Sequence, residues 1–485
     1  MTIPVLTIFT MFLFLYMVAY IFRHMIFTYS VLFGKSHSFI KSFKRITGAF
    51  MPKVSVLIPA HNEEFVIGNL LQRMTELTYP KNKLEVILVD DGSTDTTGQI
   101  ADDYARQFSF IKAIHRPNGG GGKPAALNDG IKFATGEIIL TFDADYYPQL
   151  DIVEKLVAPF VDPEVGAVQG RVTVLNEEDS LVSKVVTLER IGGYRVDQEA
   201  RDELVLVPQY GGTVGGFRRE ALNKVGGWDR YMLTEDTDLT IKMILKGYQV
   251  RYVNDAEAYE EAVTTWRAYW NQRYRWAKGH MQCAIRHLKP VIKAPFLSRY
   301  EKLELVLLLC VYFMPIFVLV AWGVGAVSYV IQEETFISLT IRPYYFFTLS
   351  VFTYSTVGNF TPFFEVGTGA YLDNRKRLLW LLPALTFTFL IMAFCCTKAL
   401  IDLSLTRNGN HKWNHTHHNG NGNGNGNGRN GNGFNGNGLN GNGHYGRNGA
   451  NGVNGFNGFY MNRNGNGNGN GNGNGNGNGN GRAAQ

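Results

Sequence analysis

The residues Val86-Ile87-Leu88-Val89-Asp90-Asp91-Gly92-Ser93 place a short apolar run directly before two aspartates and a turn sequence. Four aliphatic residues in succession are typical of a buried strand, and Asp-Gly-Ser is typical of the turn that ends one. A similar run, Val54-Ser55-Val56-Leu57-Ile58, comes earlier, and a helical pattern over 63–77 separates the two. This alternation predicts βαβ units, and therefore an α/β fold with a mostly parallel sheet over residues 52–289.

Two pairs of aspartates follow strand-like runs of this block. Asp90 and Asp91 end the run 86–89, and Asp143 and Asp145 follow the run 137–142. Ligands of parallel sheets bind at the carboxyl ends of the strands, where both pairs are expected. Side chains two positions apart on an extended backbone point to the same side, so Asp143 and Asp145 could reach one divalent cation and a diphosphate. The alternative for each pair is a surface turn, which is favoured for Asp90 and Asp91 taken alone.

Two further strings carry groups suited to phosphate binding and to acid–base chemistry. The string 118–128 has four glycines directly before Lys123, which permits close approach of a ligand to the backbone, although its spacing is not that of a Walker A loop. In Thr234-Glu235-Asp236, the carboxylate of Asp236 could take a proton from a hydroxyl group. An acidic helix N-terminus explains this second string without any function, and taken alone that explanation is favoured.

The string Gln272-Arg273-Tyr274-Arg275-Trp276 predicts a functional helix face. Gln272, Arg275 and Trp276 stand three and four residues apart, so they share one side of a helix. Arg275 could stabilise a departing diphosphate, and Trp276 could stack on a sugar. An aromatic and basic face of this kind could instead anchor the helix at a membrane surface.

Apolar segments on both sides of the block are long enough to cross a membrane, for which about 20 residues suffice. Residues 1–33 predict an uncleaved anchor, and residues 290–405 predict an interfacial helix and about three spans. Basic residues after the anchor and around Arg375 predict that those loops, and with them the block 52–289, lie in the cytoplasm, in a multi-pass protein of the cell membrane. The spans are expected at 303–331, 344–364 and 378–400.

The composition excludes several other classes of protein. The net charge is +6, and the basic residues cluster beside apolar segments, as on the flanks of membrane helices and not as on a nucleic-acid-binding surface. The 4 cysteines are too few and too scattered for a disulfide framework. Residues 408–485 are almost entirely Asn and Gly, which predicts a disordered tail, because so few apolar groups cannot offset the entropy lost on ordering.

The order of the strings is more informative than any one of them. Asp90-Asp91-Gly92-Ser93, Asp143-Ala144-Asp145, Thr234-Glu235-Asp236 and the string 272–276, followed by apolar segments, together resemble the inverting family-2 glycosyltransferases in their membrane-embedded processive branch. Cellulose, chitin, hyaluronan and poly-N-acetylglucosamine synthases share this pattern. The resemblance implies a catalytic domain of the GT-A type, with a Rossmann-like and mostly parallel sheet, flanked by transmembrane helices.

The resemblance also implies a role for each polar residue. Asp236 is expected to be the catalytic base, and Asp145 is expected to bind Mg²⁺ or Mn²⁺. The nucleotide sugar is expected to contact Glu63, Asp90, Asp91, Lys123 and Asp143. The acceptor or the diphosphate is expected to contact Glu235, Gln272, Arg275 and Trp276.

The family predicts a metal-dependent, inverting transfer from a UDP-sugar that extends a β-linked polysaccharide processively and moves it through the enzyme's own helices. The expected partners are the UDP-sugar, the growing glycan and membrane lipids, with an export subunit left open and nucleic acid excluded. A second prediction is a glycolipid synthase that transfers one sugar to a membrane lipid such as diacylglycerol. A third is an inactive transferase-like scaffold, although every acidic position that activity requires is present.

Overall fold

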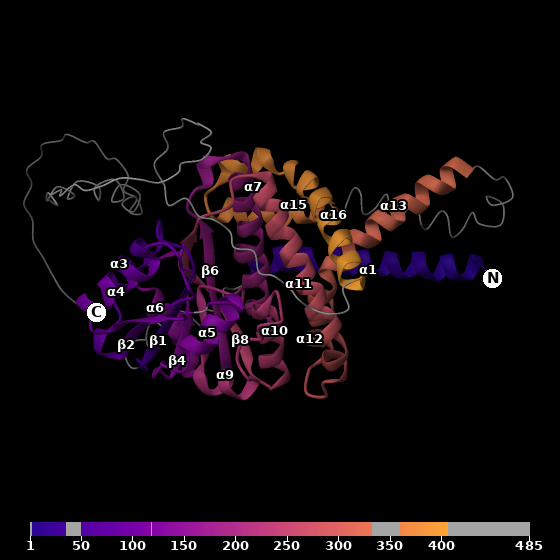
Figure 1. Ribbon diagram of the computed structural model, residues 1–485. Coiled ribbons are helices and arrows are strands. Elements are labelled where there is room, and N and C mark those ends of the chain that lie inside the picture. The colour runs from indigo at the N-terminus through magenta and orange to yellow at the C-terminus, as the bar shows by residue number, and fades with distance from the viewer. Residues whose placement is uncertain (1, 35–49, 118, 332–358, 406–485) are drawn as a thin grey trace, which may run out of the picture. The chain divides into compact units, whose positions relative to one another are not determined.

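The computed structural model describes residues 2–34, 50–117, 119–331 and 359–405, and Figure 1 shows how their helices and strands are arranged. The predicted disordered tail, residues 408–485, lies outside these ranges. Most of the predicted span 344–364 also lies outside them.

An eight-stranded sheet with the order β3-β2-β1-β4-β7-β6-β8-β5 forms the centre of the α/β block. The first four strands in this order pair in parallel, as do β6 and β8. Strand β7 is antiparallel to its neighbours β4 and β6, and β5 is antiparallel to β8. The predicted α/β fold with a mostly parallel sheet is therefore confirmed. The strands are β1 Val54–Ala60, β2 Leu84–Asp90, β3 Ile111–His115, β4 Ile138–Thr141, β5 Tyr147–Pro148, β6 Val165–Val174, β7 Gly215–Arg218 and β8 Gln249–Glu260.

Helices cover both faces of the sheet, because alternate side chains of each strand enter two different apolar layers. Val56 and Ile58 lie in one buried cluster with residues of α3 (Ile67–Glu76) and α6 (Ile152–Val157). Leu57 lies in the other, with residues of α5 (Gly122–Gly130) and α10 (Glu235–Leu245). Burial on both faces explains why the runs that predicted the strands are almost wholly apolar.

After β6 and η3, three helical segments, α7, η4 and α8, follow one another without a break, and η4 is a π-helix of 8 residues. Such π segments are rare and often occur at functional sites. The remaining helical segments of the block are η1 Lys81–Lys83, α4 Thr97–Gln107, η2 Ala158–Val161, η3 Glu177–Asp179, α7 Leu181–Arg190, η4 Ile191–Gln198, α8 Glu199–Glu203, α9 Arg219–Val225 and α11 Trp266–Lys293.

Three stretches within the described residues are long and apolar enough to cross a membrane: Leu15–Phe33, Arg299–Val320 and Ala384–Leu405. The predicted span 303–331 is not one continuous α-helix but is divided near Pro315, whose ring removes a backbone donor. The last span begins at Ala384, directly after Pro383, and not at residue 378 as predicted. The segments are α1 Thr2–Phe33, α12 Arg299–Cys310, η5 Val311–Phe313, α13 Met314–Ile331, α15 Asn359–Leu372, η7 Lys376–Leu381 and α16 Ala384–Leu405.

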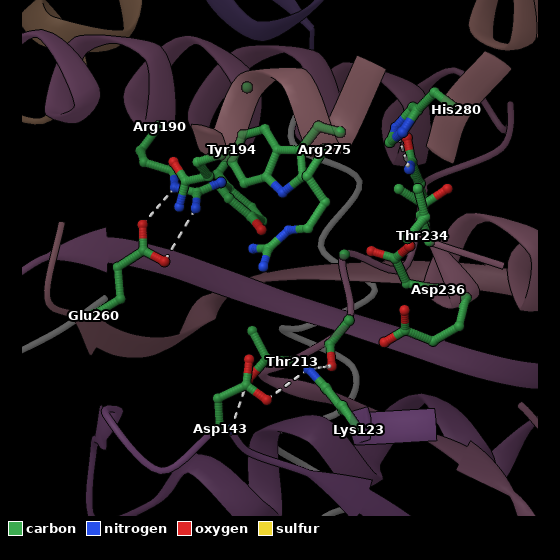
Figure 2. A pocket seen from close by; sticks show the side chains of 18 of the residues that line it. Lys123, Asp143, Arg190, Tyr194, Thr213, Thr234, Asp236, Glu260, Arg275 and His280 are labelled. Atoms are coloured by element: carbon green, nitrogen blue, oxygen red, sulfur yellow. Dashed lines mark hydrogen bonds and ion pairs between the residues drawn. The ribbon is translucent and has the colours of Figure 1, made fainter. Parts of the chain in front are cut away.

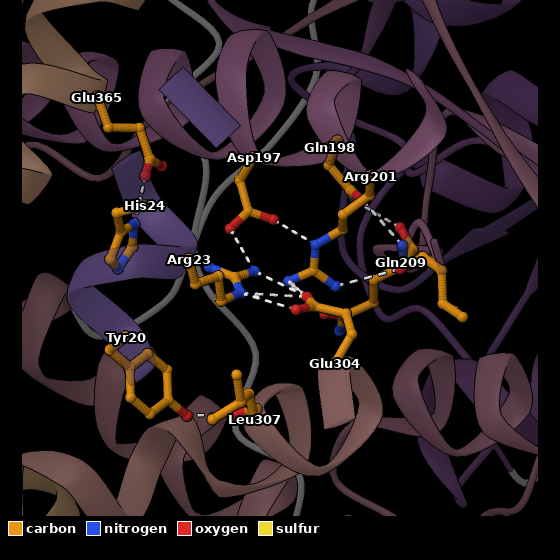
Figure 3. Close-up of polar contacts among 11 residues, drawn as sticks. Tyr20, Arg23, His24, Asp197, Gln198, Arg201, Gln209, Glu304, Leu307 and Glu365 are labelled. Carbon is orange, nitrogen blue, oxygen red and sulfur yellow. Dashed lines mark hydrogen bonds and ion pairs between the residues drawn. The ribbon is translucent and has the colours of Figure 1, made fainter. Parts of the chain in front are cut away.

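A buried set of ion pairs, called here the α1 network, joins the N-terminal helix to the α/β block (Figure 3). Arg23 of α1 pairs with Glu304 of α12 at 3.0 Å and with Asp197 of η4 at 2.8 Å. Arg201 of α8 pairs with the same two carboxylates. Because two positive groups face two negative ones, each charge is compensated even though Arg23, Arg201 and Glu304 are buried.

Candidate active site

A cavity of about 540 Å³ lies at the carboxyl ends of β1, β2 and β4 and continues between η4, α10, α11 and the helices α1 and α12 (Figure 2). It brings together residues as far apart in the sequence as Tyr20 and Tyr312. All but one of the residues that the sequence predicts for the site line it, namely Glu63, Asp91, Lys123, Asp143, Asp145, Glu235, Asp236, Gln272, Arg275 and Trp276.

One end of the cavity is formed by the loops after β1 and β2. Asn62 has a φ of 56°, a left-handed conformation that asparagine tolerates, and this turn brings Glu63 to the lining. Asp91 forms an ion pair with Arg116, and its carbonyl oxygen accepts a hydrogen bond of 2.9 Å from Nδ1 of His61. Burial raises the pKa of Asp91, although the charge of Arg116 opposes this shift.

Asp90 is the predicted site residue that does not line the cavity. Its carboxylate accepts a hydrogen bond of 2.9 Å from the backbone N–H of Ser93 and lies 3.0 Å from Nδ1 of His115. Burial alone would raise the pKa of Asp90, but these contacts outweigh burial and lower it. The alternative prediction for this pair, a surface turn, therefore fits Asp90, whereas Asp91 faces the cavity.

Lys123 enters the cavity from the first turn of α5. The residues before it, Gly119 to Gly122, all have positive φ, between 49° and 87°, which glycine adopts without the steric cost of a side chain. The Lys123 Nζ lies 2.5 Å from Oδ1 of Asp143 and donates a hydrogen bond of 2.9 Å to the carbonyl oxygen of Gly212. Burial alone would lower the pKa of Lys123, but the surrounding carboxylates, Asp143 first, raise it, so the amine stays charged.

Asp143 and Asp145, in the loop after β4, are the pair that could hold a divalent cation. Burial, and then the charges of Asp143 and Glu260, raise the pKa of Asp145 well above its usual range, so a cation beside it would stabilise its ionised form. Among the described residues no three His, Cys, Asp or Glu side chains converge as a complete metal site. Mg²⁺ is commonly held by one or two carboxylates, with substrate phosphates and water as the other ligands, and this pair fits that arrangement.

Glu235 and Asp236 begin α10 and both line the cavity, where Figure 2 shows Asp236 together with Lys123. The carboxylate of Asp236 accepts a hydrogen bond of 2.7 Å from the backbone N–H of Thr237. A Cβ atom at Gly212 would lie 3.2 Å from Oδ2 of Asp236, so glycine is what allows this segment to pass so close. Burial raises the pKa of both acids, and a raised pKa makes the Asp236 carboxylate a stronger base.

Gln272, Arg275 and Trp276 lie on the cavity side of α11, as their spacing predicts. The guanidinium group of Arg275 points into the cavity above Lys123 and Asp143 (Figure 2). The ring of Trp276 already contacts two guanidinium groups, since Cζ of Arg273 lies 4.3 Å and Cζ of Arg190 lies 5.2 Å from its centroid. Stacking of Trp276 on a sugar stays a prediction.

Several lining residues were not identified from the sequence. Arg190 and Tyr194 come from α7 and η4, and Arg190 is paired with Glu260 of β8. Gln209 donates a hydrogen bond of 2.7 Å to Oγ1 of Thr237, and burial lowers the pKa of the neighbouring His280 to about 4, so that ring is neutral. The sequence feature that could have pointed to Arg190 and Tyr194 is the pair of glycines at 192 and 193, inside an otherwise helical pattern.

Comparison with known proteins agrees with this geometry. Residues 55–226 match the family model described as Glycosyl transferase family 2. The chain is 39% identical over 246 residues to the probable glycosyltransferase YdaM of Bacillus subtilis, covering 50% of this chain and 59% of the relative. It is 34% identical over 269 residues to the beta-monoglucosyldiacylglycerol synthase of a Synechocystis species, covering 54% of this chain and 55% of that relative. It is 31% identical over 248 residues to the poly-beta-1,6-N-acetyl-D-glucosamine synthase of Staphylococcus epidermidis, covering 51% of this chain and 59% of that relative.

The matched region is only part of each protein, because the chain spans less than two thirds of the length of these curated relatives. A solved mannosyltransferase from Pyrobaculum calidifontis has the same fold, with a TM-score of 0.53 and 22% identity over 80% of this chain and 100% of that chain. The predicted GT-A-type fold and the family resemblance are therefore confirmed, and residues 55–226 form a domain of glycosyl transferase family 2.

Proposed function

We propose that the chain transfers a sugar from a UDP-sugar to a hydroxyl group by a single inverting displacement beside a membrane. The observation that carries this proposal is that one cavity is lined both by Lys123, Asp143 and Asp145 and by Asp236 and Arg275. The first group suits the diphosphate of a donor, and the second places a base and a further cation opposite it.

In this mechanism Asp236 accepts the proton of the acceptor hydroxyl. The acceptor oxygen then forms a bond to the anomeric carbon, while the bond from that carbon to the phosphate oxygen breaks and its electron pair leaves with UDP. A single displacement inverts the anomeric centre, so an α-linked donor gives a β-linked product. The backbone N–H of Thr237, 2.7 Å from Oδ1 of Asp236, holds the carboxylate in place without neutralising it.

Positive charge is needed where the diphosphate leaves. Asp145, with Asp143, would hold Mg²⁺ or Mn²⁺, which when bound supplies charge to the diphosphate oxygens. Lys123 and Arg275 supply charge from the chain itself. Both line the cavity, and the ion pair of Lys123 with Asp143 keeps its amine beside the carboxylates.

The acceptor side of the cavity is lined by membrane helices. Tyr20 and His24 of α1, Leu308 of α12 and Tyr312 of η5 belong to it, and all four fall within candidate spans. We propose a multi-pass protein of the cell membrane with a cytoplasmic catalytic domain, whose acceptor is a growing β-linked glycan or a membrane lipid. The relatives named as poly-N-acetylglucosamine and monoglucosyldiacylglycerol synthases represent these two acceptors. Processive extension and a partner subunit for export apply only if the acceptor is the growing glycan.

UDP release from the purified full chain in nanodiscs, across a panel of UDP-sugars with Mg²⁺ or Mn²⁺, tests the donor chemistry. We expect one donor to be consumed, and Asp236→Asn to slow release by about 10²–10⁴-fold while UDP binding measured by calorimetry is retained. Asp103→Asn on α4, which removes an exposed carboxylate outside the cavity, is the matched control. Release from no UDP-sugar, or full activity of Asp236→Asn, would overturn the proposal.

A further inference from the structure

A second cavity, of about 300 Å³, adjoins the acceptor end of the first. The two cavities share Tyr20 and His24 of α1 and Val311 and Tyr312 of η5 in their linings. A ligand that reaches Asp236 from the membrane side can therefore extend past these four residues into the second cavity. The other residues that line the second cavity are Ile21, Met314, Pro315, Pro362, Phe389 and Met392.

The second cavity offers hydrocarbon surface and few polar partners. The residues that line it alone are aliphatic or aromatic and carry no side-chain hydrogen-bonding group beyond the thioethers of Met314 and Met392. Of the shared residues, Tyr20 donates its hydroxyl hydrogen to the carbonyl oxygen of Leu307. His24 forms an ion pair with Glu365. A hydrocarbon chain needs no such partners, so it can pass from the bilayer into this cavity without leaving a polar group unsatisfied.

A polysaccharide would fit this cavity poorly. Each sugar residue carries several hydroxyl groups, and burying a hydroxyl without a hydrogen bond is unfavourable. Polar side chains are instead concentrated along the first cavity, whose lining includes Asp236 and also Arg23, Asp197 and Arg201 of the α1 network. Figure 3 shows these three residues of the network. The lining thus changes from polar beside the reacting groups to apolar beyond Tyr20 and His24.

We propose that the acceptor is an amphiphilic lipid whose hydrocarbon chain occupies the second cavity while its hydroxyl group lies at Asp236. This inference rests on the proposed function and names its acceptor class. It assigns the apolar cavity between α1, η5, α13, α15 and α16 as the binding site for the chain, and it selects the lipid over the growing glycan as acceptor.

Filling the cavity tests this assignment. Ile21→Trp places a larger ring in the lining of the second cavity, and Ile26→Trp makes the same change on an exposed face of the same helix. Met392→Trp fills the cavity from α16 and guards against a local folding defect at Ile21. Each purified variant is placed in nanodiscs made from a total lipid extract of the producing host, with a UDP-sugar labelled in the sugar.

In the wild type we expect label in the chloroform-soluble fraction, and we expect Ile21→Trp and Met392→Trp to lower it at least tenfold. Ile26→Trp should leave it unchanged, and UDP binding measured by calorimetry should be the same in all four proteins. A dioleoylglycerol analogue with a diazirine in its acyl chain should cross-link to peptides that contain Ile21 or Met392, and Ile21→Trp should abolish this labelling. That readout does not require turnover.

Label found only in a water-soluble or high-molecular-weight product, at rates unaffected by Ile21→Trp, would overturn the lipid assignment and leave the donor chemistry standing. Cross-links spread evenly over the exposed faces of α1, with none that depend on residue 21, would also overturn it. Failure of the donor chemistry has a different signature, because then the wild type would release no UDP from any donor.

Discussion

Replacing Glu304 by glutamine is expected to destabilise the protein by about 3–5 kcal/mol. Both partners of the central ion pair are buried, with Arg23 8% and Glu304 6% exposed. The Nε of Arg23 lies 3.1 Å from each carboxylate oxygen of Glu304, and Nη2 of Arg23 lies 3.0 Å from Oε1 of Glu304. Removal of this carboxylate leaves two guanidinium groups, of Arg23 and Arg201, facing Asp197 alone, so one positive charge stays buried without compensation.

The double variant Arg23→Met/Glu304→Met separates this cost from simple loss of contacts. It leaves Arg201 and Asp197 as a balanced pair, and replacing a buried ion pair by apolar side chains is often close to neutral. We therefore expect the double variant to be more stable than either single variant, Glu304→Met or Arg23→Met, with a coupling energy of roughly 2–3 kcal/mol. As a control, Glu76→Gln breaks an exposed pair with Arg73 and is expected to cost about 0–1 kcal/mol.

Thermal unfolding in nanodiscs, followed by tryptophan fluorescence, measures these differences. A loss of 3–5 kcal/mol corresponds to a midpoint lower by about 6–20 °C, at 2–4 °C per kcal/mol. The reasoning is refuted if Glu304→Gln lies as close to the wild type as Glu76→Gln does. It is also refuted if the losses of the two single variants simply add in the double variant, because the charges would then not be coupled.

Three further predictions concern the cavity. Arg275→Gln should lower kcat by about 10²–10³-fold, measured as UDP release at saturating donor, and an unchanged kcat would remove Arg275 from the leaving-group site. Since burial raises the pKa of Asp236, kcat/KM in a profile from pH 5 to 9 should fall as the pH drops through that raised pKa, and a rate that does not fall on the acid side would contradict the role of Asp236 as the base. Asp145→Asn should raise the Mn²⁺ concentration for half-maximal UDP release at least about 10-fold, and equal metal dependence would contradict its predicted role.

The strands were predictable because their surroundings are uniform. The runs 54–58 and 86–89 are apolar at nearly every position since both faces of the sheet are covered, and a purely local pattern reports this. The helix after β1 was predicted to start at residue 63, whereas it starts at Ile67, because the turn at Asn62 uses the intervening residues. The sequence contains the apolar pattern but not the path of that turn.

The site residues were predictable one string at a time, but their relative positions were not. Neighbouring residues at the end of a strand point to opposite sides, so Asp90 and Asp91 could not both face the cavity, and only the fold decides which of them does. For Asp236 the sequence allowed two explanations, an acidic helix N-terminus and a site residue. Both hold, since Asp236 lies in the first turn of α10 and also lines the cavity. The α1 network joins Arg23 to Glu304 across 281 positions, a pairing that no local pattern reveals.

The two ends of the cavity come from different parts of the chain. Glu63, Asp91, Lys123, Asp143 and Asp145 fall within the family 2 match at residues 55–226, whereas Asp236, Arg275 and the residues of the second cavity all lie outside it. Because Tyr20, Ile21 and His24 of α1 also line the second cavity, the acceptor end of a relative would be acquired only if α1 and the part of the chain after β7 were exchanged together. For engineering, a chimera therefore needs two crossover points, one between α1 and β1 and one between β7 and α10.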